Sequence, residues 1–230
     1  MDSFELVIFD CDGVLIDSEV ISAQMLIAEL AEYGVAVDRA YVAKHFLGRS
    51  YPVVLSQIQA DFGIVLPAGF EADYRARLLA AFDADLQVMP GVTETIDRLR
   101  VPYCLATSSS PKRLDHTLRI VGLDARFQGR TTTASEVAHG KPAPDLFLRA
   151  AEKSGTPPAR CLVIEDSVAG IRAALSAGMT VWHFTGGSHL TGLDLPSDPE
   201  VRPHRTIETY AEFFDPAPEL KSEAAVNDTR

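Results

Sequence analysis

The stretch that decides the fold reads FELVIFDCDGVL, from Phe4 to Leu15. Its first six residues are apolar except for Glu5, and the run ends abruptly at Asp10. A short apolar run that stops at a polar residue is typical of a buried strand in a parallel sheet. Ligands of open α/β sheets bind beyond the carboxyl ends of the strands. We therefore expect a functional site where this run ends.

The two acids after the run carry the first chemical signal. Asp10 and Asp12 are two residues apart, but the chain turns there, so both carboxylates can face one cavity. One can attack a phosphorus atom while the other passes a proton to the leaving oxygen, and two anions beside a phosphate favour a hard cation such as Mg²⁺. Taken by itself, the pattern fits a metal-free turn with solvated acids equally well.

Similar apolar runs recur later in the chain, with helical patterns between them. One helical pattern opens at Pro111 and closes at Gly122, and another is capped by Ser167 and ends at Gly178. Strands that alternate with helices at this spacing predict an α/β fold with a doubly wound parallel sheet. The later strands are expected at residues 102–106, 161–164 and 179–184.

The segment from residue 17 to residue 85 breaks this alternation. It holds three helical patterns, near residues 18–33, 52–61 and 69–83, and no convincing strand. An all-helical insertion directly after the first strand indicates a second domain, a cap. The expected domains are a core of residues 1–16 and 86–214, a helical cap of residues 17–85 and a flexible tail of residues 215–230.

Composition narrows the setting in which the protein works. The net charge of −11 repels nucleic acids, anionic lipids and phosphorylated metabolites, so a phosphate substrate needs local capture by a metal, a lysine and backbone amides. The three cysteines lie in apolar runs, which favours a reducing compartment. No apolar stretch reaches the roughly 20 residues that span a bilayer. We expect a cytoplasmic protein that binds neither nucleic acid nor membrane.

Three further motifs lie at strand ends or helix starts. Thr107 and Ser108 close the second strand, Lys141 lies in a proline-bracketed loop, and Glu165 and Asp166 follow another strand. Each has an ordinary explanation, as a helix cap, a solvated lysine and acids that favour a helix dipole. Their common placement at the carboxyl edge of the sheet is what one phosphate site would require.

Together these motifs resemble the haloacid dehalogenase (HAD) superfamily of phosphotransferases, from Phe4 to about Phe214. The signature includes DCDGVL, the strand-end Thr/Ser pair, GKPAPDLF, and ED followed by SVAGIRAALSAGM. The resemblance implies a Rossmann-like core with a helical cap inserted after the first motif. The presence of Asp12 disfavours the true dehalogenases, which lack an acid at that position and need no metal.

The resemblance also implies roles for single residues. Asp10 would be the nucleophile that forms an aspartyl-phosphate, and Asp12 the general acid and then the general base. Thr107 and the backbone of Ser108 would bind the transferred phosphoryl group, while Lys141 would balance charge. The implied Mg²⁺ ligands are Asp10, the Asp12 carbonyl, Asp166 and, directly or through water, Glu165.

The subgroup most resembled contains β-phosphoglucomutases and small sugar-phosphate phosphatases. The mutases carry a histidine where this chain has Ser22, and a lysine where it has Ser110. Both departures favour hydrolysis. Residues 10–21 look most like phosphatases of sugar phosphates and sugar-acid phosphates such as 6-phosphogluconate. The remaining alternatives are a β-phosphoglucomutase-like isomerase and a non-catalytic binding protein of the HAD fold.

The cap selects the substrate in such enzymes. Arg49, between Gly48 and Ser50, falls in a loop where these caps reach toward the active site, and it can contact a substrate hydroxyl or carboxylate. An ordinary surface arginine explains the same position equally well. We expect a monomer whose partner is a small phosphorylated metabolite.

Overall fold

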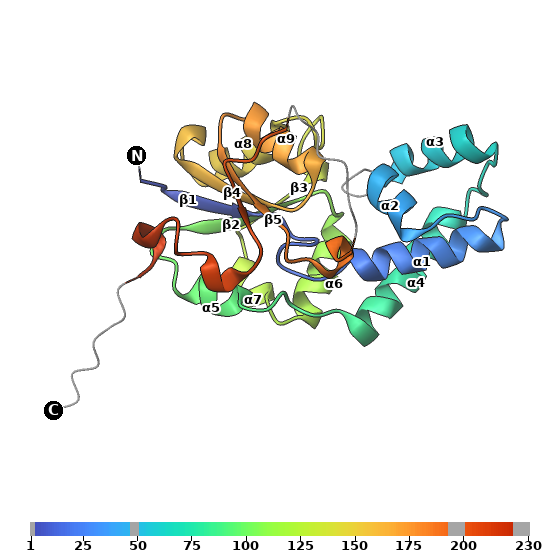
Figure 1. Ribbon diagram of the computed structural model, residues 1–230, viewed down its shortest axis with the longest axis horizontal. Helices are drawn as coiled ribbons and strands as arrows, with labels where there is room; N and C mark the ends of the chain where they lie inside the picture. Colours follow the sequence, from blue (N-terminus) through green and yellow to red (C-terminus); the bar gives the residue numbers. More distant parts are fainter. Residues whose placement is uncertain (1–2, 47–50, 193–200, 223–230) are drawn as a thin grey trace.

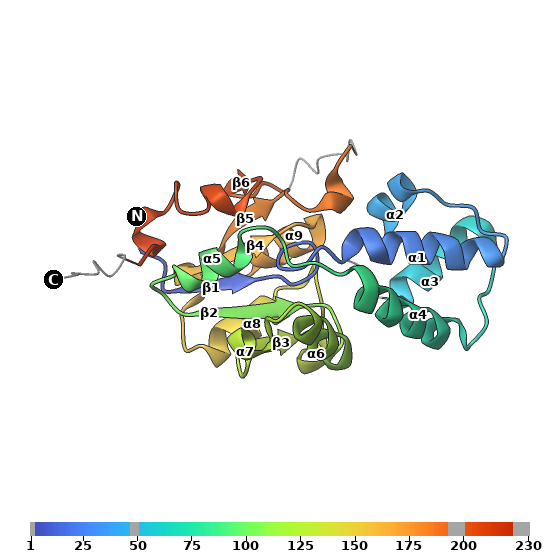
Figure 2. The ribbon, with the colours of Figure 1, turned by 90° about the horizontal axis from the view of Figure 1, so that it is seen from below.

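The computed structural model describes residues 3–46, 51–192 and 201–222. It has two parts, an α/β core and a helical segment that stands at one end of the core (Figures 1 and 2). No helix within the described ranges is long and apolar enough to cross a membrane.

A parallel sheet of six strands forms the centre of the core, in the order β3-β2-β1-β4-β5-β6. The predicted α/β fold with a doubly wound parallel sheet is confirmed. Two strands, β3 and β6, were not predicted, because each has only three residues and neither is an apolar run. The strands are β1 (Leu6–Phe9), β2 (Tyr103–Thr107), β3 (Thr131–Thr133), β4 (Cys161–Glu165), β5 (Thr180–Phe184) and β6 (Arg205–Ile207).

Helices cover both faces of this sheet (Figure 1). On one face lie α8 (Asp145–Lys153) and α9 (Val168–Ser176). On the other lie α5 (Val92–Asp97), α6 (Pro111–Ile120) and α7 (Asp124–Phe127). The short 3₁₀ helices are η1 (Ala134–Glu136), η2 (Pro158–Arg160), η3 (Ser188–Leu190), η4 (Tyr210–Glu212) and η5 (Pro218–Leu220).

Strand β1 is buried on both faces. Leu6 and Ile8 pack with α8 and α9, whereas Val7 and Phe9 pack into the opposite layer. This two-sided burial explains the continuous apolar run. The chain leaves β1 for β2 on one side and later returns to β4 on the other, so the strand order reverses beside β1. Such a switch point is where open α/β sheets bind ligands.

The described residues of the helical segment form four helices, where three were predicted: α1 (Glu19–Glu32), α2 (Arg39–His45), α3 (Tyr51–Phe62) and α4 (Phe70–Asp85). The additional helix, α2, has seven residues, and the Asp38 side chain caps it by accepting from the Tyr41 N–H at 2.7 Å. Helix α1 packs along α4, where the Tyr74 hydroxyl donates to the Ser22 carbonyl at 3.2 Å. The two helices thus form one compact layer.

The helical segment enters and leaves the core at one place. The Asp17 N–H donates to the Gln87 carbonyl at 3.0 Å, and Ile16 pairs with Val88 as an antiparallel bridge. The two connections therefore run side by side (Figure 2).

The prediction of a flexible tail from residue 215 is wrong for residues 215–222. Ala217 and Leu220 are buried in the core, and the Leu220 carbonyl accepts from the Arg100 N–H at 2.9 Å. The Ser222 N–H donates to the Arg98 carbonyl at 2.7 Å. The polar composition of this segment hid these few apolar anchors.

Candidate active site

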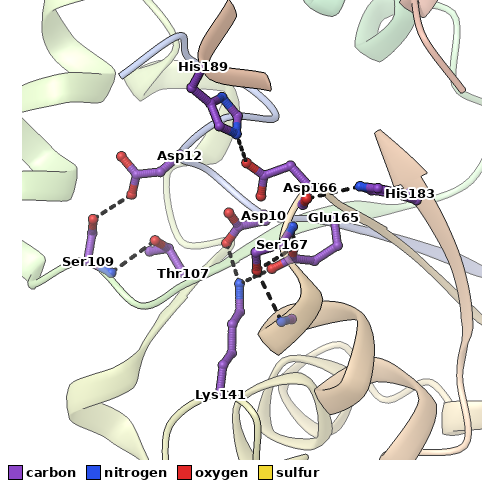
Figure 3. A network of polar contacts seen from close by, with 11 residues as sticks. Asp10, Asp12, Thr107, Ser109, Lys141, Glu165, Asp166, Ser167, His183 and His189 are labelled. Carbon is purple, nitrogen blue, oxygen red and sulfur yellow. Dashed lines mark hydrogen bonds and ion pairs between the residues drawn. The ribbon is translucent and has the colours of Figure 1, made fainter. Parts of the chain in front are cut away.

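The predicted functional groups meet at the carboxyl edge of the sheet (Figure 3). Asp10 directly follows β1, Thr107 is the last residue of β2, and Glu165 is the last residue of β4, with Asp166 after it. Because β2, β1 and β4 are neighbours, these residues lie together. Lys141 reaches the same place from the loop that precedes α8.

Lys141 joins two of the acids. Its ammonium donates to Asp10 Oδ1 at 2.6 Å and to Glu165 Oε1 at 2.6 Å, and it lies 5.1 Å from the centre of the Phe147 ring. The lysine side chain is only 3% exposed. Burial lowers the pKa of Lys141, but the two carboxylates outweigh burial and raise it, so the ammonium stays charged.

Three buried carboxylates surround this single ammonium. Ligand oxygens of Asp10, Glu165 and Asp166 lie within 4.8 Å of one another. Burial raises the pKa of Asp10 and of Asp166 well above the usual range, and the charge of Glu165 raises both further, while Lys141 opposes. With all three acids ionised, the cluster lacks two positive charges, which is what one divalent cation supplies.

The acids differ in how many of their oxygens are occupied. Both oxygens of Glu165 are taken, one by Lys141 and the other by the N–H and hydroxyl of Ser167 at 2.6 and 3.0 Å. Asp166 Oδ2 lies 3.1 Å from His189 Nε2 without hydrogen-bond geometry, so among the described residues this buried oxygen has no hydrogen-bond partner. An orphaned carboxylate oxygen in a buried acidic cluster fits a hard metal ligand.

Two glycines make room for these carboxylates. Gly13 has a φ of +78°, and a Cβ there would lie 1.9 Å from Asp166 Oδ2. A Cβ at Gly170, in the first turn of α9, would lie 1.7 Å from Glu165 Oε1. Any side chain at either position would displace an acid of the cluster.

Asp12 faces the same cavity but belongs to a separate set of contacts. Its Oδ1 accepts from the Ser18 hydroxyl at 2.5 Å and from Arg113 Nη2 at 2.7 Å, and its Oδ2 accepts from the Ser109 hydroxyl at 2.7 Å. Burial raises the pKa of Asp12, but the Arg113 charge and these hydrogen bonds outweigh it, and the net pKa lies below the usual range. This carboxyl is therefore held as an anion.

Thr107 and Ser108 also line the cavity. Thr107 is buried, and its hydroxyl accepts from the Ser109 N–H at 3.0 Å, while Ser108 is exposed to the cavity. Ser110 then caps α6 by accepting from the Arg113 N–H at 3.5 Å. Hydroxyls and N–H groups before a helix N-terminus favour an anion here.

These groups form the floor of a cavity of about 650 Å³ between the core and the helical segment. The opposite wall is largely apolar and comes from α1–α4: Leu26, Val42, Phe46, Val54, Leu78 and Leu79. Arg49, the predicted substrate contact, lies outside the described residues.

Several polar residues of the cavity were not predicted from the sequence. Arg113, Ser109 and Ser18 contact Asp12, and His189 reaches Asp166 from η3, which follows β5. Glu19 also lines the cavity; burial, reinforced by the Asp12 charge, raises its pKa to about 7. The only signal for Ser109 was its place beside the predicted Thr107 and Ser108.

Comparison with known proteins yields consistent matches. A family model of haloacid dehalogenase-like hydrolases matches residues 4–178. The 6-phosphogluconate phosphatase of Escherichia coli is 28% identical over 212 residues, which is 91% of this chain and 92% of that protein. A phosphorylated carbohydrates phosphatase of Thermotoga maritima is 27% identical over 76% of this chain and 82% of its own length.

Solved structures agree with these sequence matches. A haloacid dehalogenase-like protein of unknown function from Agrobacterium tumefaciens is 33% identical, with a TM-score of 0.82 over 95% of this chain and 99% of its own. A hydrolase of the same family from Deinococcus radiodurans, solved with bound phosphate and sodium, is 33% identical, with a TM-score of 0.75 over 96% of this chain and 97% of its own.

Proposed function

The chain belongs to the haloacid dehalogenase-like hydrolase family, and from that premise we propose that it is a magnesium-dependent phosphatase of small phosphorylated metabolites that takes the phosphoryl group onto Asp10. One observation carries the proposal. Asp10 lies at the switch point of the sheet in a buried cluster with Lys141, Glu165 and Asp166, and Asp12 faces the same cavity. A nucleophile, a charge partner and a proton carrier are thus within one site.

The first half of the reaction forms a covalent intermediate. A carboxylate oxygen of Asp10 attacks phosphorus as the bond between phosphorus and the ester oxygen breaks, and Asp12 gives the departing oxygen its proton. Thr107 and Ser108 bind the transferred group, and Lys141 offsets its charge. A phosphate monoester that enters the cavity adds negative charge beside Asp12. A neighbouring like charge raises the pKa of a carboxyl group and so favours the protonated Asp12 that this proton transfer needs.

The second half releases phosphate. Water attacks phosphorus, Asp12 takes the proton of that water, and Asp10 is restored together with inorganic phosphate. The anionic Asp12 described above is the form that accepts this proton.

Magnesium fits the acids that line this site. We propose Asp10, Asp166 and the Asp12 carbonyl as direct ligands, with Glu165 acting through water because Lys141 and Ser167 occupy both of its oxygens. When bound, Mg²⁺ would neutralise the surplus charge of the cluster and polarise the phosphoryl oxygens.

The substrates proposed first are sugar phosphates and sugar-acid phosphates such as 6-phosphogluconate. The names of the Escherichia coli and Thermotoga maritima relatives support this class. We further propose that residues 17–85 act as a cap that selects among these substrates, over a core of residues 1–16 and 86–214. The buried free cysteines support a place in the cytoplasm.

Phosphate release from a panel of sugar and sugar-acid phosphates tests the proposal. We expect steady, Mg²⁺-dependent release that EDTA abolishes and Mg²⁺ restores, and a loss on the order of 10⁴-fold or more in Asp10→Asn. Phosphate bound covalently to the wild-type chain, but not to Asp10→Asn, would be the expected intermediate. Absence of release from every compound contradicts the proposal. Conversion of β-glucose 1-phosphate to glucose 6-phosphate with little free phosphate would favour the isomerase instead.

A further inference from the structure

Arg113 connects the proposed proton carrier with the helical segment. It projects from α6, and its Nη2 donates to Asp12 Oδ1 at 2.7 Å; both side chains are largely shielded from solvent, at 24% and 13% exposure. Ser18 and Ser109 supply the other donors to this carboxylate. Three donors, one directly before α1 and two at the start of α6, thus fix the direction of one carboxylate, and only Arg113 among them carries a charge.

The other side of Arg113 rests on the helical segment. Its guanidinium carbon lies 5.1 Å from the centre of the Phe82 ring, and Phe82 is a fully buried residue of α4. One turn further along α6, His116 lies 3.0 Å from Asp83, the next residue of α4. The orientation of Arg113 therefore depends on how α4 packs against α6.

We propose that Arg113 is the positioning residue of Asp12: it directs the Asp12 carboxylate toward the ester oxygen of the substrate. Because Arg113 also contacts Phe82, this direction depends on how α4 packs against α6. The inference rests on the proposed phosphatase reaction, because positioning matters only where Asp12 transfers a proton.

A direct substrate contact fits the geometry less well. Arg113 lines the cavity, but its Nη2 is already engaged by Asp12. Its Nε is buried and, within the described part of the chain, has no hydrogen-bond partner, so no molecule in the open cavity reaches it. The guanidinium plane is held by Phe82 on the cap side. Arg113 acts through Asp12.

The test uses two substrates that differ in their need for a proton. An alkyl phosphate needs its leaving oxygen protonated, whereas p-nitrophenyl phosphate releases p-nitrophenolate, a stable anion that needs no proton to leave. We expect Arg113→Gln to lower kcat/KM for the best alkyl phosphate by about 10²-fold, and for p-nitrophenyl phosphate by less than about threefold. Asp12→Asn should show the same selectivity, and Arg113→Lys should recover part of the alkyl activity.

A double variant separates positioning from substrate binding. Arg113→Gln added to Asp12→Asn should cause no further loss, because Arg113 acts through the missing carboxylate. The inference would be overturned if the losses of the two single variants multiplied in the double variant, or if Arg113→Gln lowered kcat/KM equally for both substrates. Failure of the phosphatase proposal looks different: the wild-type chain would release phosphate from neither substrate, and the inference would fall with it.

Two more variants complete the experiment. Phe82→Leu keeps an apolar side chain but removes the ring, and it should reproduce the selectivity for alkyl phosphates in weaker form. An equal effect on both substrates would remove α4 from the inference. Arg126→Gln, which breaks the Arg126–Asp97 ion pair away from the cavity, is the matched control and should leave the ratio of the two kcat/KM values unchanged. Circular dichroism and thermal unfolding of each variant report folding independently.

Discussion

The two walls of the cavity differ in chemistry. On the core side, Asp10, Glu165 and Lys141 are buried and joined by short ion pairs, and Asp12 has three donors. On the helical side, the described lining is mainly alkyl and aromatic. Substitutions on the core side disturb the balance of buried charges, whereas those on the helical side change the shape and polarity of the cavity. In the proposed function, reaction and selection are therefore divided between the two parts of the chain.

Among the substitutions that test this difference between the two walls, Lys141→Met should have the largest effect. Removing the ammonium leaves Asp10 and Glu165 buried without their shared cation, which we expect to cost about 3–5 kcal/mol in free energy of unfolding. The thermal midpoint should fall on the order of 10 °C, and phosphate release should be lost.

Lys153→Met is the matched control for this variant, because Lys153 pairs with Glu136 at 2.9 Å but is 33% exposed. It should cost about 1 kcal/mol or less. Equal destabilisation by the two variants would contradict a special charge balance at the core wall.

Magnesium should stabilise the protein more at neutral than at acidic pH. The raised pKa values of Asp10 and Asp166 contribute stability to the metal-free protein at low pH, and this contribution is lost as pH rises through them. A cation binds the ionised acids, so its effect has the opposite sign. At 100 times its dissociation constant, Mg²⁺ should add about 2.7 kcal/mol at pH 7.5 and less at pH 5.

Thermal unfolding with and without Mg²⁺ at both pH values measures this difference, and Asp166→Asn should shrink it. A larger shift at pH 5 would contradict the assignment of these two acids to the cation.

The helical wall should respond in binding rather than in chemistry. Leu79→Asn places a polar group in the apolar lining, and we expect KM for the best substrate to rise about fivefold while kcat stays within about twofold. Leu148→Asn, a partly exposed leucine of α8 outside the lining, is the control. A loss of kcat with unchanged KM would show that the two walls are not separable in function.

The smallest effect concerns Arg49, whose side chain lies outside the described residues. If Arg49 contacts the substrate, Arg49→Ala should raise KM about threefold for an acidic sugar phosphate. An unchanged KM would remove it from the candidate site.

The core could be predicted from the sequence because its signals are local. A strand buried on both faces must be an apolar run, and the residue that ends it must lie at the sheet edge, which sufficed for Asp10, Thr107, Glu165 and Asp166. The sheet order then brings them together without further information. The three-residue strands β3 and β6 escaped notice because so short a segment carries no periodicity.

The contacts of Asp12 could not be predicted in the same way. Arg113 and Ser18 contact it only because α6 and α1 turn particular faces to the loop after β1. His189 comes from η3, which folds back toward the site after β5. Such meetings depend on packing between segments far apart in sequence. The same reason explains the missed anchor at Leu220.

The paired connections at Ile16–Val88 and Asp17–Gln87 have a consequence for how such a protein is assembled and changes. Because the insertion starts and ends at adjacent points, its length adds little to the entropy of closing the core around it. The sheet keeps its own contacts whatever the insertion contains. Helices can be lengthened, added or exchanged between these two connections while Asp10 stays in place. Under the proposed function, substrate preference can therefore change in evolution through the helical insertion while the reactive groups around Asp10 are preserved.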